Sequence, residues 1–86
     1  MTERAANTLT LNHPITRTDD TVLRELEFRR PTGRDLRQMG KLKGSQIDQS
    51  LWLIAKLTGI APDETDLLDG EDINRASEII DGFLSR

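Results

Sequence analysis

The residue types that most often catalyse reactions or bind metals are scarce in this chain. Its 86 residues include one histidine, His13, and no cysteine. A catalytic histidine needs a partner group, and a structural zinc site is built from several histidine or cysteine ligands. His13 precedes Pro14 in a predicted bend, and the chain has no second histidine. We therefore interpret His13 as a surface residue and predict no catalytic residue, no metal site and no cofactor.

Acidic side chains gather towards the C-terminal end and invite a calcium interpretation. They are Asp63, Glu64, Asp66, Asp69, Glu71 and Asp72. An EF-hand loop needs a glycine and a distal glutamate at fixed positions, and the spacing here does not supply them. We interpret these carboxylates as helix caps and a solvated face. No phosphate-binding loop or nucleophile elbow occurs either, so nothing indicates an enzyme.

The net charge of −3 conceals an uneven distribution along the chain. Residues 29–59 carry seven basic and two acidic side chains, whereas residues 60–86 carry two basic and eight acidic ones. We expect these two segments to attract each other, within one chain or between copies. The alternative is a regulatory or nucleic-acid-binding module that uses the basic residues of segment 29–43. These are Arg29, Arg30, Arg34, Arg37, Lys41 and Lys43. With three aromatic residues and a pI near 5.0, we predict no nucleic-acid partner.

The length fits one small domain with a thin core. Residues 1–7 are polar and are predicted to form a flexible N-terminus, with a single domain over residues 8–86. No apolar signal region follows the N-terminus, and no run approaches the ~18 apolar residues of a membrane span. We expect a soluble intracellular protein without a membrane partner.

The segment Arg29–Leu36 separates two kinds of hydrophobic pattern. Before it, apolar residues recur about every second position, and after it they recur at helical spacing. Pro31 cannot continue a sheet ladder, and Thr32 with Asp35 forms a variant capping box. The sequence therefore predicts an α+β fold. A β-hairpin over about 8–30, irregular near Leu23–Arg24, is followed by three to four α-helices over about 32–39, 46–58, 63–68 and 71–84.

The two longer predicted helices differ in their apolar surfaces. The last helix has one apolar face, whereas apolar residues of helix 46–58 spread over an arc of about 260°. Such a helix in a small domain either is the central helix of the core or leaves part of its apolar surface for a partner. Both explanations stay open from the sequence.

Three stretches, in this order, resemble one known family. They are Leu9–Ile15 (LTLNHPI), Leu26–Arg37 (LEFRRPTGRDLR) and the terminal Gly82–Leu84 (GFL). Together they resemble the tail assembly chaperones of contractile-tailed phages, the E-type tail proteins of Mu-like and related phages and prophages. The resemblance covers about residues 8–84.

The resemblance implies a function in the cytoplasm of an infected bacterial host. Such proteins bind the tape measure protein, keep it soluble until tail tube subunits assemble around it, and are absent from the finished virion. Many are also made in a longer frameshifted form whose extension engages the tail tube protein, and this chain would be the short form. No residue of the family is catalytic. A plain oligomerisation module is a further alternative, because an unpaired hairpin and segregated charge both favour self-association.

A tape measure protein is a long helix with exposed apolar stripes, and a leucine- and tryptophan-rich helix can cover such a stripe. We therefore hypothesise a partner-binding surface around the wide apolar arc. It consists of Leu36, Met39, Leu51, Trp52, Leu53 and Leu57.

Overall fold

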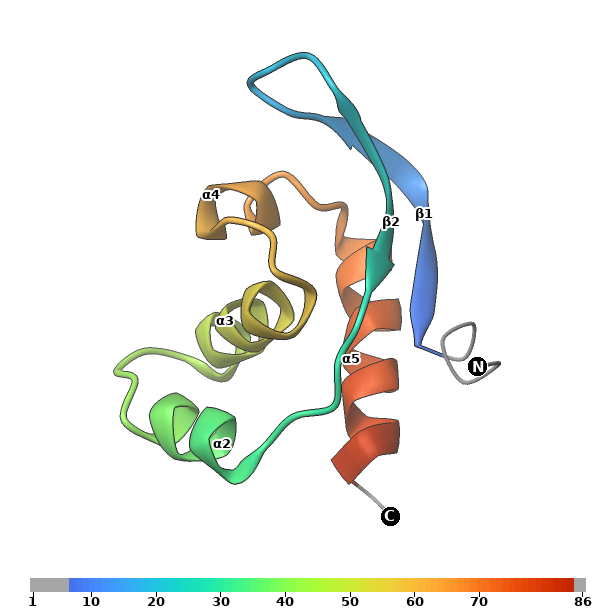
Figure 1. Ribbon diagram of the computed structural model, residues 1–86. Coiled ribbons are helices and arrows are strands. Elements are labelled where there is room, and N and C mark those ends of the chain that lie inside the picture. The colour runs from blue at the N-terminus through green and yellow to red at the C-terminus, as the bar shows by residue number, and fades with distance from the viewer. Residues whose placement is uncertain (1–6, 85–86) are drawn as a thin grey trace.

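The computed structural model describes residues 7–84, and over that range it is a hairpin followed by four helices (Figure 1). The elements are β1 (Thr8–Thr16), β2 (Val22–Glu27), α2 (Gly33–Gly40), α3 (Gln46–Thr58), α4 (Pro62–Thr65) and α5 (Gly70–Leu84). This order confirms the predicted α+β fold. Of the predicted flexible N-terminus, residues 1–6 lie outside the described residues. Figure 1 shows α2, α3 and α4 on one side of α5 and β1 on the other, with the turn of the hairpin above α4.

The antiparallel hairpin has an irregular register in its middle. Thr10 pairs with Glu25 and Ile15 pairs with Leu23, so residues 11–14 stand opposite Arg24. The sequence predicted an irregularity at Leu23–Arg24 and a bend at His13–Pro14, and the extra residues lie in β1, at the predicted bend. Pro14 accounts for this, because proline has no N–H to donate to a strand ladder.

Strand β2 ends at Glu27, earlier than the predicted Arg30. Phe28 still makes one bond to the opposite side of the hairpin, and the chain then leaves the ladder because the next N–H finds its acceptor in α3. The N–H of Phe28 donates to the Asn7 carbonyl oxygen, and that of Arg29 donates to the Leu57 carbonyl oxygen at 3.0 Å. The second of these bonds ties the end of the hairpin to α3.

The helix boundaries follow the predicted capping signals. The Thr32 hydroxyl accepts the N–H of Asp35 while the Asp35 carboxylate accepts the N–H of Thr32, and Ser45 with Asp48 repeats this box at α3. Gly59 closes α3 in the left-handed conformation at φ 79°, which glycine adopts without a steric penalty. The helices match their predicted ranges closely, except that α4 ends at Thr65 rather than at residue 68.

Helix α3 is the centre of the core and contacts α2, α4, α5 and β2. The buried apolar side chains come from the hairpin and the residue after it, from α3 and α5, and from the links on either side of α4. They are Leu9, Leu11, Ile15, Leu26, Phe28, Leu53, Ile54, Ala55, Leu57, Ile60, Leu68, Ala76 and Ile80. The wide apolar arc of α3 therefore serves first as the hub of the core, while Leu51 and Trp52 stay half-buried at its margin.

An ion pair locks the joint between the hairpin and α2. The Arg29 guanidinium donates two hydrogen bonds to the Asp35 carboxylate, at 2.7 and 3.0 Å. Asp35 is 2% exposed and also accepts the N–H and hydroxyl of Thr32. The Arg29 guanidinium, with the bonds from Thr32, holds the pKa of Asp35 far below its usual range, although burial opposes this.

A second buried carboxylate, Asp72, fastens the irregular part of β1 to α5. Asp72 is fully buried and accepts the N–H groups of Asn12 at 3.0 Å and His13 at 2.9 Å. Arg75 donates to Asp72 at 2.9 Å and to the Thr10 carbonyl oxygen at 3.0 Å. Asp72 was predicted to belong to a helix cap and a solvated face, which is wrong: it is buried, and its carboxylate binds backbone N–H groups of β1. Backbone N–H groups that the bulge removes from the strand ladder need a buried acceptor, and Asp72 supplies it.

Burial by itself raises the pKa of Asp72, but the accepted hydrogen bonds from Asn12, His13 and Arg75 outweigh that effect, and the pKa is lowered. Both buried aspartates are thus held in the ionised form.

Replacing Asp72 by Asn tests this fastening. An amide offers one acceptor oxygen and turns an N–H₂ donor towards backbone donors, so at least one buried N–H loses its partner. We expect Asp72→Asn to lower the free energy of unfolding by about 2–3 kcal/mol in urea denaturation. Asp81→Asn, on the exposed part of α5, is the matched control and should change it by less than about 0.5 kcal/mol. Equal stabilities of the two variants would contradict the assigned role.

Acid should destabilise the fold through Asp35 and Asp72. Both pKa values are lower in the folded chain than the ordinary 3.8, so their stabilisation is complete above about pH 5 and is lost as the pH falls through 3.8 towards the folded values. Urea midpoints measured from about pH 6 down to about pH 2.5 should fall steeply below about pH 4. The loss should be shallower in Asp72→Asn, which has one fewer linked carboxylate. A parallel loss in both proteins would refute the linkage to Asp72.

Candidate partner-binding surface

The structure divides the six residues of the hypothesised surface between the core and the exterior. Leu53 and Leu57 are each 3% exposed and belong to the core cluster. Neither side chain can reach a partner while the domain stays folded, so we exclude both from the hypothesised binding surface. The sequence could not separate them from their neighbours, because a wide apolar arc does not show which part other elements cover.

Leu51 and Trp52 line a groove between α3 and α4. The groove has a volume of about 460 Å³, and Ala55, Ile60 and Pro62 form more of its apolar wall. Capping explains its position: Gly59 turns the chain sharply after α3, and Pro62 starts α4 at once. The short link therefore holds α4 beside α3 and leaves the half-buried Trp52 facing the space between them.

The rim of this groove is mainly acidic. Asp48, Asp63 and Asp66 contribute carboxylates, and Lys56 contributes one ammonium group. The Lys56 Nζ lies 5.8 Å from the centre of the Trp52 ring, within the range of a cation–π contact. A partner that fits here presents an apolar side chain to the wall and positive charge to the rim.

Leu36 and Met39 lie on α2, apart from that groove. Leu36 is 37% exposed. Met39 is half-buried and lines a smaller groove of about 150 Å³ between α2, α3 and α5, together with Ile80 and Leu84. The hypothesised residues therefore do not form one patch. Leu51 and Trp52 border one groove and Met39 borders the other, on different sides of α3.

The basic segment 29–43 is partly engaged within the chain. Arg29 is bound to Asp35, and the Arg30 guanidinium lies 5.2 Å from the centre of the Phe83 ring. Phosphate contacts need cations that are available to the nucleic acid. Two of the six cations named for that alternative are already committed to structural contacts.

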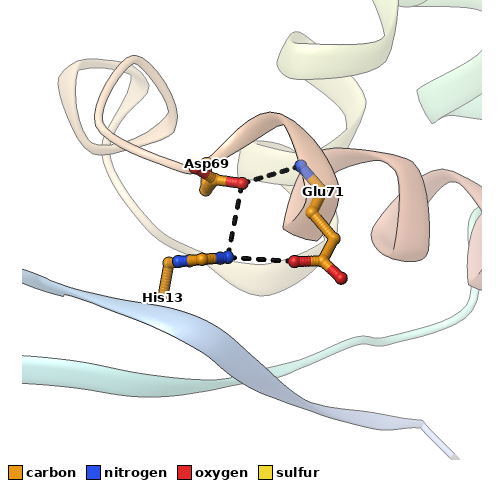
Figure 2. A group of neighbouring side chains, drawn as sticks. All are labelled: His13, Asp69 and Glu71. Atoms are coloured by element: carbon orange, nitrogen blue, oxygen red, sulfur yellow. Dashed lines mark hydrogen bonds and ion pairs between the residues drawn. The ribbon is translucent and has the colours of Figure 1, made fainter.

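One group of chemically capable side chains was missed by the sequence reasoning. The imidazole Nε2 of His13 lies 2.9 Å from the Glu71 Oε1 and 3.6 Å from the Asp69 Oδ2 (Figure 2). All three residues are exposed. The hydrogen bond with Glu71, aided by the charges of Asp69 and Asp72, raises the pKa of His13 above 6.5 against a small effect of burial. No spacing in the sequence signals this group, because His13 and Glu71 are 58 residues apart.

Within residues 7–84, no helix combines the length and the apolar character needed to cross a bilayer.

The sequence was also compared with known proteins. No curated protein and no solved structure gives a significant match to the chain. The model of a family described as "Phage tail assembly chaperone proteins, E, or 41 or 14" matches residues 8–85. That range begins with β1 and ends just after α5, so it contains every element of the fold. The resemblance seen in the three sequence stretches is thereby confirmed, and the chain belongs to the phage tail assembly chaperone family.

Proposed function

We propose that this protein binds the tape measure protein in the bacterial host cytoplasm and keeps it soluble until the tail tube forms around it. It helps to recruit tail tube subunits, through a longer frameshifted form, and is left out of the mature virion. Membership of the tail assembly chaperone family supports the general role. The identity of the partner and the surface that binds it are the proposed parts.

The observation that carries this proposal is the apolar groove between α3 and α4. Leu51 and Trp52 leave part of their surface in solvent beside the buried core residues of α3. Covering exposed apolar area is favourable by about 25 cal/mol per Å², so a partner's apolar side chain gains by entering. Tryptophan is enriched among the residues that dominate binding energy.

The acidic rim adds a requirement on the partner. With Asp48, Asp63 and Asp66 facing one Lys56, the rim attracts a helix whose apolar stripe is flanked by lysine or arginine. Such pairs lie near solvent, so salt screens them over a Debye length of about 8–10 Å. Apolar contact then supplies most of the affinity, and the rim charges orient the helix.

Charge introduced into the wall of the groove should abolish chaperone activity. We expect Leu51→Glu and Trp52→Glu each to leave co-expressed tape measure protein insoluble, because a buried glutamate without a partner opposes docking. The control is Val22→Glu, which changes an apolar side chain that is 43% exposed on the hairpin. It should keep the tape measure protein soluble. Circular dichroism of each variant separates lost binding from lost folding. Folded groove variants that still solubilise the tape measure protein would refute this surface.

Reversing the rim charge should weaken binding without disturbing the core. We expect the double variant Asp63→Lys/Asp66→Lys to bind the tape measure protein at least about tenfold more weakly at low salt, with a smaller difference at high salt. Glu25→Lys/Glu78→Lys makes the same change in net charge at exposed positions away from the groove. Its affinity should stay close to that of the unaltered protein. Equal weakening of both double variants would show that net charge alone is responsible.

A further inference from the structure

The imidazole of His13 and two carboxylates converge from opposite halves of the fold. Figure 2 shows the Nε2 of His13 turned towards both Asp69 and Glu71. We propose that these three side chains form a binding site for a divalent transition-metal ion, with Zn²⁺ as the representative ion. The proposal is independent of the tape measure interaction, because these residues lie outside the α3–α4 groove.

The spacing of the ligand atoms fits this ion. Zinc binds nitrogen and oxygen ligands at about 2.0–2.2 Å in a tetrahedron, which puts ligand atoms roughly 3.3 Å apart. The Nε2 of His13 lies 2.9 Å from Glu71 and 3.6 Å from Asp69, so the two distances bracket that value. The three ligand atoms all lie within 4.8 Å of one another. Small side-chain rotations would place the three ligand atoms at three of the four positions of the tetrahedron.

The ligand set favours a transition metal over calcium or magnesium. An imidazole nitrogen suits zinc, copper, iron and nickel, whereas calcium and magnesium prefer oxygen ligands alone. Two carboxylates beside the imidazole match the charge of a divalent cation. Because all three residues are exposed, water has access to the fourth position.

The backbone around the site is held by buried bonds rather than by the ligands themselves. Asp72 accepts the backbone N–H groups of Asn12 and His13 and thereby fixes the bend of β1 against the start of α5. The Asp69 carboxylate accepts the N–H of Glu71 at 3.0 Å, which orients it towards the imidazole. Such outer contacts, which orient ligands in advance, accompany most metal sites.

A metal bound here would join the hairpin to α5. The three ligands come from β1, the link before α5 and the first turn of α5. Any ion that binds the folded chain and not the unfolded one raises the apparent stability with its concentration. A bound ion would therefore hold the hairpin against α5 and stabilise the folded domain.

Titration of the full chain without a polyhistidine tag tests the site. Isothermal titration calorimetry with ZnCl₂ should show saturable binding of one ion per chain, and Tm should rise by several degrees. His13→Gln and Glu71→Gln should each weaken binding at least about tenfold. Glu78→Gln, an exposed change on the same helix, should bind like the unaltered chain. Absence of saturable binding, or equal affinity in His13→Gln, would overturn the proposal.

A second measurement needs no variant. His13 is the sole histidine, so its ring signals in ¹H–¹⁵N NMR report this site alone. They should shift on addition of Zn²⁺ and stay unchanged with Ca²⁺. Zinc and the proton compete for the same Nε2, which faces Asp69 and Glu71, so the affinity for zinc should fall as the pH is lowered. Unmoved ring signals, or equal responses to both ions, would refute the assignment.

Discussion

The buried carboxylate of Asp72 is the contact on which the arrangement of the two halves depends. A two-stranded hairpin is marginal in water by itself, so this one must be held against the helices. Its register is interrupted over residues 11–14, which leaves backbone N–H groups without strand partners. Asp72 accepts two of them from the first turn of α5, and Arg75 balances its charge while binding the Thr10 carbonyl oxygen. The irregular segment that interrupts the strand pairing therefore also binds the hairpin to α5.

This attachment determines which apolar surface stays open. With the hairpin held along α5, the core side chains Leu53, Ile54 and Leu57 of α3 are covered by β2, α2 and α5. The side of α3 that carries Leu51 and Trp52 meets only the single turn of α4. Four residues of helix cannot cover a thirteen-residue neighbour, so the groove follows from the difference in length. The groove that we propose as the binding surface therefore results from the way the other elements pack around α3.

Sequence reasoning succeeded where neighbouring residues determine the outcome. The predicted box of Thr32 and Asp35 depends on backbone groups only a few positions away, and it sets the start of α2. Sequence reasoning failed where the deciding contact joins distant segments. Asp72 has the sequence surroundings of a solvated helix cap, yet its partners lie about 60 residues away. The same holds for the cluster around His13. The charge pattern likewise did not show that Arg29 pairs with Asp35, six residues away.

The size of the groove constrains what a chaperone could do with it. A groove of about 460 Å³ holds only a few side chains, whereas a stable interface involves about 20–30 residues on each side. Contact through this groove alone would be weak, and the proposed function also requires the chaperone to leave as tube subunits arrive. If the proposed function holds, a shallow apolar groove with screened rim charges meets both needs, because it protects an apolar stripe and still releases it to a larger interface. Deepening the groove would strengthen binding and delay that release. The single turn of α4 is therefore as relevant to the function as the tryptophan beside it.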